Sequence, residues 1–365
     1  MTAKALAAGD AAPWFHCRSR VNPRYTFDTA AGRYIVLHFF GTAARPQAAE
    51  LLHDFQRIRP LFDDQHASFF GVSMDPADEQ LQRVNDAVPG IRYFWDFDGV
   101  VSRLYGALAE DHAYQPLTYI LDPRLRILAI LPINTVAGHV DMVRDILRRL
   151  PRSAPPAPAL AQAPVLVVPR ILEAELCQQL IEVYEQHGGE ESGFMQERNG
   201  LTVTVHGHRH KRRRDHHLQD LALRDAVLVR LRRRLVPEVL KAFQFSATYI
   251  ERMLVACYDS AEGGHFRAHR DNTTKGTAHR RFAVSLFLNT GGYEGGLLRF
   301  PEFGNSLYSA PTGGAVVFSC SLLHEATPVT QGKRYMFLPF LYDDDAKRVR
   351  DANQQYLEDN GKALP

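Results

Sequence analysis

The chain has 365 residues, 45% hydrophobic and 23% charged, which is enough for two globular domains of ordinary size. Its 43 Lys and Arg residues nearly balance 41 Asp and Glu residues, for a formal net charge of +2. This balance gives no global sign of binding to nucleic acid or to a membrane surface, and we expect neither partner.

The cysteines and the first residues predict a cytoplasmic protein. The four cysteines form no CxxC pair and no zinc-ligand spacing, which suits a reducing compartment. Residues 1–15 lack the basic run and apolar core of a secretory signal, and no stretch approaches the ~20 apolar residues of a membrane span. The sequence leaves open whether the chain forms a homodimer.

Residues 1–150 alternate predicted strands and helices. Continuous apolar runs predict buried strands, and apolar residues at helical spacing predict the helices between them. In chain order these are a strand at 34–40, a helix at 47–62, a strand at 67–74, a helix at 77–87, a hairpin of 117–123 with 127–133, and a helix at 139–150. The order predicts an α/β domain with a mixed sheet.

Four motifs of this domain, AAGDAAPWF, GVSMDP, WDFDGVVSRLYGA and QPLTYILDP, resemble the thioredoxin fold in its peroxiredoxin version. Aligning Glu50 with the acidic residue that follows the family's peroxidatic cysteine puts Gln47 at the place of that cysteine. Leu117 stands where the family usually has an assisting arginine. Because an amide cannot form a thiolate, the resemblance implies a redox-inactive domain that acts as a scaffold or holds a partner.

Cys17 is the only thiol of this domain. It precedes the first central strand and does not start a helix, where the helix dipole would lower the pKa of a thiol. We therefore interpret Cys17 as structural, and a peroxidase that uses Cys17 is an alternative.

Residues 151–164, PRSAPPAPALAQAP, hold five prolines set among alanines. Such a segment forms neither a helix interior nor a central strand and behaves as a spacer. We therefore predict a thioredoxin-like domain at 1–150, a linker at 151–164, a second domain at 165–345 and a polar tail at 346–365 that forms a surface helix.

The second domain begins with a short strand and an amphipathic helix, followed by a helical region at 221–244 that Pro237 should break or kink. Between these helices, the segment 206–217 is rich in His and Arg. We favour an exposed loop there, with a patch for an acidic substrate or phosphate and a role at the active-site rim as alternatives. From Thr248, short strands and Gly-rich turns are typical of a jelly roll.

Three residues of this domain predict a non-haem iron site. His269 and Asp271 are two residues apart, so both face one side of a strand, and His324 follows 53 residues after Asp271. Two imidazoles and one carboxylate occupy one face of an octahedral Fe(II) and leave three positions for O2 and a bidentate co-substrate.

Arg334 lies ten residues after His324, beyond a turn at 330–332. Its planar guanidinium can bind a carboxylate with two hydrogen bonds, which suits a dicarboxylate that chelates iron by its other end. Lys333 precedes Arg334, and adjacent strand residues face opposite sides, so only one of them can enter the pocket. We favour Arg334, with Lys333 as the alternative.

With these residues, the segment from about Val165 to Asp344 resembles the 2-oxoglutarate and Fe(II)-dependent dioxygenases of the prolyl 4-hydroxylase α-subunit type. The resemblance implies a double-stranded β-helix, and ascorbate is a reductant in several members. It places iron and 2-oxoglutarate at His269, Asp271, His324, Arg334 and Tyr258, where Tyr258 either hydrogen-bonds the co-substrate or is a half-buried sheet residue.

The sequence therefore predicts a dioxygenase that hydroxylates a small-molecule or peptidyl substrate, with peptidyl proline as the first candidate. Free amino acids and protein side chains also remain open as substrates. The alternative from another class is a non-catalytic binding protein with a vestigial iron site.

Overall fold

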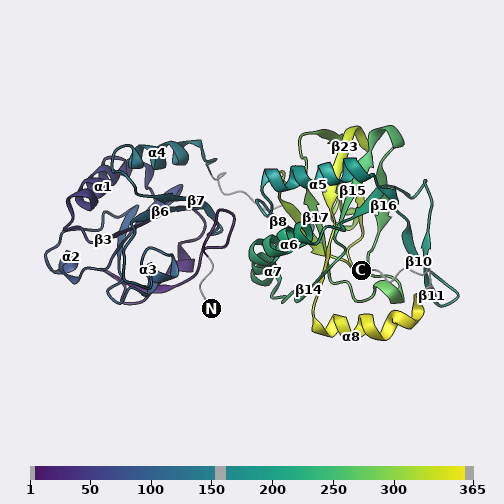
Figure 1. The fold of residues 1–365 in the computed structure, drawn as a ribbon, viewed down its shortest axis with the longest axis horizontal. Helices are drawn as coiled ribbons and strands as arrows, with labels where there is room; N and C mark the ends of the chain where they lie inside the picture. The colour runs from purple at the N-terminus through teal and green to yellow at the C-terminus, as the bar shows by residue number, and fades with distance from the viewer. Residues whose placement is uncertain (1–4, 153–161, 358–365) are drawn as a thin grey trace. The chain divides into compact units, whose positions relative to one another are not determined.

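The structure of the protein is a computed structural model that describes residues 5–152 and 162–357 (Figure 1). The chain divides into two compact units, Met1–Ala157 and Pro158–Pro365. Most of the segment predicted as a linker, 151–164, lies outside the described residues. Among the described helices, none combines the length and the apolar character needed to cross a bilayer.

The first unit is built on a seven-stranded mixed sheet in the order β2-β1-β5-β4-β3-β6-β7. Its strands are β1 (His16–Ser19), β2 (Tyr25–Thr26), β3 (Tyr34–Gly41), β4 (Ala67–Ser73), β5 (Ile91–Trp95), β6 (Leu117–Leu121) and β7 (Ile127–Pro132). The central β3 pairs parallel with β4 and antiparallel with β6, and β6 and β7 form the predicted hairpin. Because β3 and β4 are buried along their whole length, both faces of the sheet must be covered.

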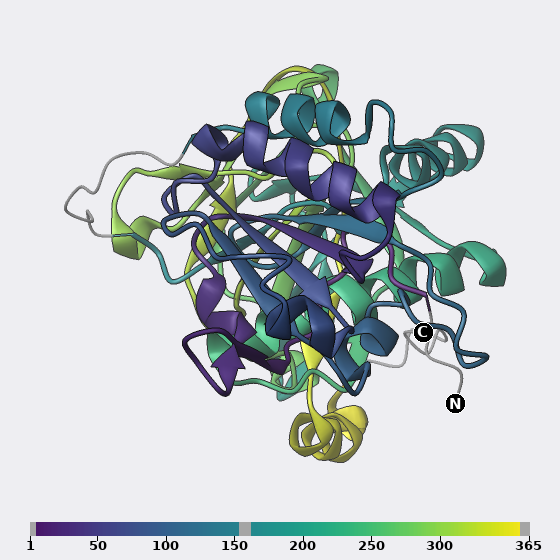
Figure 2. The same ribbon diagram turned by 90° about the vertical axis from the view of Figure 1, so that its left-hand side faces the viewer.

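Helices cover the two faces of this sheet. Alternate residues of β3 separate the two cores: Ile35 and Leu37 pack with α3 (Val100–Leu104), while Val36 packs with α1 (Pro46–Arg57) and α4 (His139–Arg149). Figure 2 shows α1 beside α4 on the same face. The result is the α/β arrangement that the order of elements predicts.

Two helices are shorter than predicted. The first ends at Arg57, and a 3-10 turn at Arg59–Leu61 follows, because Pro60 cannot donate the next helical hydrogen bond. The second, α2, covers only Pro76–Gln80. The chain leaves this helix at Gln82, whose φ of 51° lies in the left-handed region.

The second unit contains two larger sheets and a hairpin. The major sheet follows the order β14-β24-β17-β23-β15-β13-β9, with β18, β21 and β8 attached, and the minor sheet the order β12-β16-β22-β19-β20. The major strands are β8 (Leu166–Val168), β9 (Glu190–Glu191), β13 (Arg214–His217), β14 (Tyr249–Glu251), β15 (Leu254–Asp259), β17 (Phe282–Phe287), β18 (Tyr293–Gly295), β21 (Ala315–Ser319), β23 (Val329–Phe337) and β24 (Phe340–Tyr342). The others are β12 (Lys211–Arg212), β16 (His265–His269), β19 (Leu298–Arg299), β20 (Leu307–Tyr308), β22 (His324–Ala326) and the hairpin β10 (Phe194–Arg198) with β11 (Leu201–Val205).

The two faces of the major sheet have different partners. Val255 and Cys257 of β15 pack on the helices α5 (Ala174–His187), α6 (Leu221–Arg230) and α7 (Val236–Phe243). Ala256 and Tyr258, the alternate residues, join the core that also holds Phe266 of the minor sheet. This is the jelly-roll arrangement, in which the interior between the sheets is available for a site.

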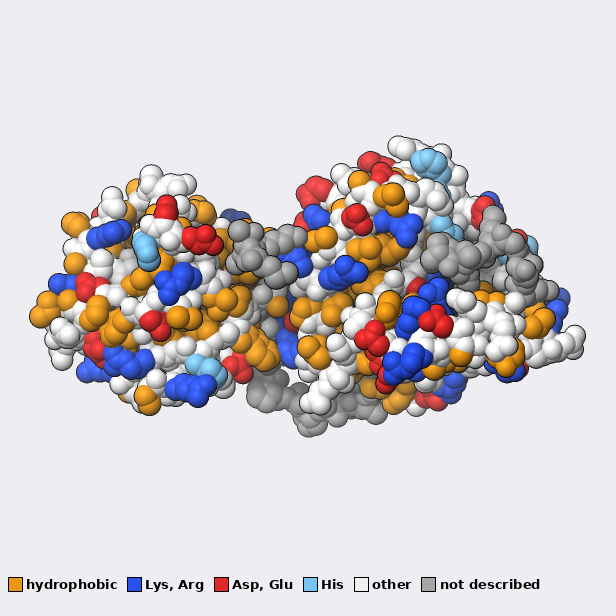
Figure 3. Space-filling model, turned by 60° about the horizontal axis from the view of Figure 1, so that its bottom comes forward, with side chains coloured by type: hydrophobic (Ala, Val, Ile, Leu, Met, Phe, Trp, Pro, Cys, Tyr) orange, Lys and Arg blue, Asp and Glu red, His pale blue; other side chains and the backbone are white. Residues whose placement is uncertain are grey.

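The helical region at 221–244 is interrupted, as Pro237 predicts. A π-helical turn at Leu231–Leu235 separates α6 from α7, and Pro237, which has no N–H to donate, lies in the first turn of α7 directly after it. The first part of the tail predicted as a surface helix, 346–365, belongs to α8 (Asp344–Asn353), which Asp343 caps by accepting from the Ala346 N–H, and residues 358–365 lie outside the described residues. On the face shown in Figure 3, basic and acidic side chains are interspersed.

We predict that Gly313→Ala destabilises the second unit far more than Gly263→Ala. Both glycines have positive φ, but a Cβ at Gly313 would lie 2.1 Å from the backbone oxygen of Leu172, whereas at Gly263 the nearest atom is 3.5 Å away. Left-handed strain costs about 1 kcal/mol at either site, and the clash should bring the loss at Gly313 above about 3 kcal/mol. Differential scanning calorimetry measures this difference, and equal losses would contradict the prediction.

Candidate active site

The pairing of β16 with β22 brings two distant imidazoles together. His269 and His324 lie opposite each other in the register of these strands. Asp271 follows β16, where its backbone N–H donates to the Cys320 carbonyl at 3.0 Å. Its Oδ1 lies 3.5 Å from His269 Nε2, and its Oδ2 lies 3.3 Å from His324 Nε2. One ligand atom of each residue falls within 4.8 Å of the others, which is close enough to share one metal ion.

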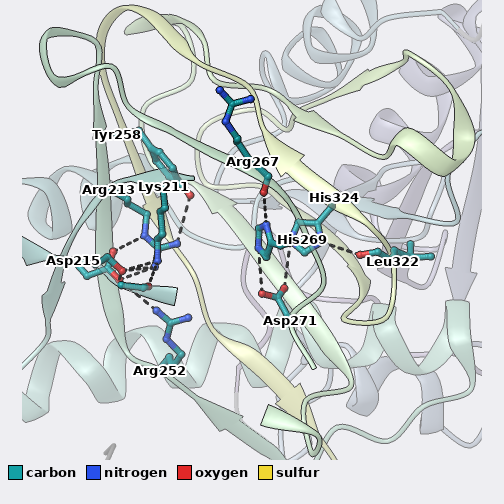
Figure 4. A network of polar contacts seen from close by, with 12 residues as sticks. Lys211, Arg213, Asp215, Arg252, Tyr258, Arg267, His269, Asp271, Leu322 and His324 are labelled. Atoms are coloured by element: carbon teal, nitrogen blue, oxygen red, sulfur yellow. Dashed lines mark hydrogen bonds and ion pairs between the residues drawn. The ribbon is translucent and has the colours of Figure 1, made fainter. Parts of the chain in front are cut away.

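Backbone carbonyls orient both imidazoles. His269 Nδ1–H donates to the Arg267 oxygen at 2.7 Å, and His324 Nδ1–H donates to the Leu322 oxygen at 3.0 Å (Figure 4). With the proton on Nδ1, each Nε2 keeps its lone pair directed toward Asp271. The two rings are therefore held in the tautomer that a metal ligand needs.

The cluster lies in a sheltered, aromatic environment. The Phe266 ring stacks on His269 at 3.5 Å between centroids, and Phe318 lies 4.5 Å from His324. Burial lowers the pKa of His324 to about 4, so the ring is neutral at physiological pH. Burial would raise the pKa of Asp271, but the His324 and His269 imidazoles outweigh this and hold the pKa well below its usual range. The donor set is thus two imidazoles and one carboxylate.

Arg334 and Tyr258 lie opposite each other on β23 and β15, facing the interior between the sheets. The Arg334 side chain is buried, with its guanidinium carbon 4.9 Å from the Tyr258 ring and 5.3 Å from the Phe287 ring. Its Nε has no hydrogen-bond partner among the described residues. A buried, unpaired guanidinium is costly unless an anion joins it, so this position can receive a carboxylate.

Lys333 points away from this interior. Its Nζ lies 3.2 Å from Glu185 Oε1, and both side chains are 46% exposed. Arg334 lines the cavity that also contains the candidate metal ligands, and Lys333 does not. Strand alternation therefore separates the two candidates as expected.

One cavity of about 560 Å3 connects these groups. Its lining includes the three residues of the metal cluster together with Tyr258 and Arg334. This volume is in the usual range for small-molecule sites. It therefore has room for a co-substrate and a second small molecule.

The expectation that 206–217 forms an exposed loop holds for 206–210 and is wrong from Lys211 on. β12 pairs with β16, and β13 pairs with β15, so alternate residues Lys211, Arg213 and Asp215 turn inward, are buried and line the cavity. The sequence contained a signal for this arrangement: two bases and an acid at a spacing of two residues, which is the period of one strand face. Sequence reasoning did not single out these three residues, although it left a basic patch and a role at the active-site rim open for the segment.

These inward residues form a compact ion network (Figure 4). Arg213 donates to both Asp215 oxygens, at 2.7 and 2.6 Å, and Lys211 donates to Ser192 Oγ at 2.8 Å. Burial lowers the pKa of Lys211 well below its usual range. Burial would raise the pKa of Asp215, but the Arg213 guanidinium more than offsets this and keeps the carboxylate charged.

In the first unit, the position that corresponds to the peroxidatic cysteine of peroxiredoxins holds no thiol. Gln47 is exposed at the start of α1, and Cys17 is buried in β1. Burial, with Asp96 nearby, raises the pKa of Cys17 to about 12. Such a thiol is almost never a thiolate at neutral pH.

Comparison with known proteins identifies both units. Residues 253–342 match the model of the 2OG-Fe(II) oxygenase superfamily, and residues 8–130 match that of the AhpC/TSA family. A PKHD-type hydroxylase of Synechococcus sp. (strain JA-2-3B'a(2-13)) is 27% identical over 161 residues, which cover 40% of this chain and 68% of that protein. A PKHD-type hydroxylase of Nitrosomonas eutropha is 32% identical over 149 residues, which cover 38% of this chain and 61% of that protein.

The solved structures similar to this chain include peroxiredoxins. Peroxiredoxin Q of Xanthomonas campestris is 21% identical, with a TM-score of 0.32, over 37% of this chain and 89% of that one. Peroxidoxin BcpB of Mycobacterium tuberculosis is 18% identical, with a TM-score of 0.36, over 40% of this chain and 99% of that one.

Each unit contains one family match, and the match in the second unit contains the clustered imidazoles and carboxylate. The chain is therefore a prolyl-hydroxylase-like 2-oxoglutarate/Fe(II)-dependent dioxygenase that carries a peroxiredoxin-like domain N-terminal to its oxygenase domain.

Proposed function

We propose that the enzyme hydroxylates an aliphatic C–H bond, with His269, Asp271 and His324 as the ligands of Fe(II). The observation that carries this proposal is the convergence of these side chains, with the Nε2 atoms of both imidazoles directed toward the carboxylate. This donor set leaves coordination positions free on an octahedral ion. When bound, Fe(II) and 2-oxoglutarate supply the activation of O2, with succinate and CO2 as coproducts.

Arg334 and Tyr258 are our candidates for binding the co-substrate. The unpaired Nε of Arg334 supports a role in holding the distal carboxylate of 2-oxoglutarate. Tyr258 is 3% exposed, and its hydroxyl accepts from Arg213 Nη1 at 3.4 Å, a long bond that leaves its own proton free to donate. Burial of both residues would keep water away from the bound keto acid.

A peptidyl proline is the first candidate substrate, because the relatives are PKHD-type hydroxylases and the domain is prolyl-hydroxylase-like. Free amino acids, small metabolites and other protein side chains are the alternative substrates. Ascorbate is the proposed reductant that restores Fe(II) after unproductive turnover. The four free, buried cysteines support a reducing compartment, and we propose the cytoplasm.

The first unit is proposed to be redox-inactive and to act as a scaffold or as a module for a partner, including a second copy of the chain. Gln47 at the helix start and the buried Cys17 support this role. Nothing about this unit's fold requires a thiol, because its two cores are built from apolar residues on both sheet faces.

We predict that His324→Ala abolishes both metal binding and turnover. Titration calorimetry with Mn(II) should show affinity reduced by more than about 100-fold, since one of three ligands is lost. Succinate formation from 2-oxoglutarate, with Fe(II), ascorbate and O2, should fall to background. His187→Ala, which changes an exposed histidine of α5, is the control that keeps both. Absence of succinate formation by the wild type, including slow uncoupled turnover, would contradict the proposal and favour a binding protein with a vestigial site.

We predict that Arg334→Gln raises the KM for 2-oxoglutarate by about 10- to 100-fold, because charge-assisted hydrogen bonds contribute about 1.5–3 kcal/mol. Lys333→Gln should leave this KM nearly unchanged, because Lys333 pairs with Glu185 at the surface. Initial rates of succinate formation measure both values. An effect of equal size in the two variants would argue against the proposed role of Arg334.

We predict that Cys17→Ser does not alter peroxide consumption. The wild type should consume peroxide no faster than the variant, because a buried thiol with a pKa of about 12 supplies almost no thiolate. A peroxide-dependent rate that disappears in Cys17→Ser and survives His269→Ala would instead establish the Cys17 peroxidase.

A further inference from the structure

Beside the candidate metal ligands, the cavity has a wall of four basic side chains, which we call the cation wall: Lys211, Arg213, Arg252 and Arg280. Figure 4 shows three of these four, Lys211, Arg213 and Arg252, gathered around Asp215 and apart from the metal cluster. The wall thus belongs to the same cavity as the candidate metal ligands but is a separate feature of it.

The carboxylates that contact the cation wall do not balance its charge. Asp215 forms two short bonds with Arg213 and lies 3.4 Å from Arg252. Glu251 accepts from Arg280 Nε at 2.9 Å, but it also contacts His279 at 3.0 Å. Two carboxylates therefore face three guanidinium groups and the Lys211 amine.

Arg252 and Arg280 keep donors available to a ligand. The described residues use only Nη2 of Arg252, toward Asp215, and only Nε of Arg280, toward Glu251. Their guanidinium carbons lie 5.3 and 4.2 Å from the centroid of the Phe340 ring, so one aromatic ring contacts both guanidinium groups and keeps them close together. Burial, and then the charge of Arg213, lower the pKa of Arg252 to about 10, which is the direction expected of a guanidinium short of counter-charge.

Neither the co-substrate nor the acidic residues at the rim of the cavity would neutralise the cation wall. Under the proposed function, the two carboxylates of 2-oxoglutarate balance Arg334 and the charge that Fe(II) keeps after binding Asp271. Glu190 and Glu191 also line the cavity, but both are exposed, and Glu191 contacts His208 at 2.8 Å. Solvent screens carboxylates at such a rim, so the cation wall still lacks an anion.

The geometry points to a substrate that carries a carboxylate group, bound by the free donors of Arg252 and Arg280, with its C–H bond toward the metal cluster in the same cavity. This inference rests on the proposed function and specifies its substrate class. Planar guanidiniums bind carboxylates with paired hydrogen bonds. The carboxylate comes either from a small free acid or from an acidic side chain of a peptide.

The test is a comparison of charged and neutral probes in the full-length Fe(II) enzyme. Succinate formation above the uncoupled rate is measured with free L-amino acids and dicarboxylic acids, with their primary amides, and with short proline peptides that contain Glu or Gln. We expect stimulation by acids to exceed stimulation by the matched amides at least tenfold. A response to free acids identifies a small-molecule substrate, and a response to Glu peptides alone identifies a protein side chain.

Variants tie the response to the cation wall. Arg252→Gln and Arg280→Gln should raise the KM for the stimulating acid at least tenfold, and more than they raise the KM for 2-oxoglutarate. Arg252→Lys and Arg280→Lys should recover part of the loss, which a purely structural defect would not permit. Arg281→Gln is the matched control, because Arg281 bonds to the Ala278 carbonyl and does not line the cavity.

The outcomes separate the inference from the proposed function. Equal stimulation by amides and acids, an unchanged KM in the Gln variants, or uncoupled turnover that no acidic probe stimulates would overturn the inference and leave the oxygenase in place. Absence of uncoupled succinate formation by the wild type would overturn both the inference and the proposed function.

Discussion

The pairing of β16 with β22 is the constraint on which the oxygenase unit depends. It places His269 directly opposite His324, although 54 positions separate them in the chain, and the turn after β16 adds Asp271. The minor sheet and the turn after β16 therefore supply the proposed metal ligands, while β15 and β23 of the major sheet supply Tyr258 and Arg334. A site built between two hydrogen-bonded sheets has little freedom to drift, since moving any member requires breaking a strand pairing.

Much of this site can be predicted because it depends on local periodicity. The His269-x-Asp271 spacing and the choice of Arg334 over Lys333 both follow from the two-residue repeat of a strand. The cation wall was not predicted, because Lys211 and Arg213 turn inward only when β12 and β13 add to the edges of two different sheets. The length of α1 was overestimated because the helical spacing of apolar residues continues past Arg57. The helix ends there because Pro60 cannot donate the next backbone hydrogen bond.

The first unit has a peroxiredoxin-like fold without a cysteine at the place of the reactive cysteine. Its sheet and both of its cores match the peroxiredoxin-like pattern, yet an exposed Gln47 stands where the resemblance places the reactive cysteine. A surface residue at a helix start contributes little to packing, so stability places almost no demand on it. Loss of a reactive group leaves a stable scaffold available for another use.

The bonds from His269 and His324 to main-chain oxygens have a consequence for tolerance to mutation. Many metal sites orient their histidines with a second layer of acidic side chains, any of which a single codon change can remove. Here the acceptors are the carbonyl groups of Arg267 and Leu322, which every amino acid possesses. The orientation of both rings is thus encoded in backbone shape, and the residues that provide it can vary in identity during evolution while the two imidazoles stay aligned.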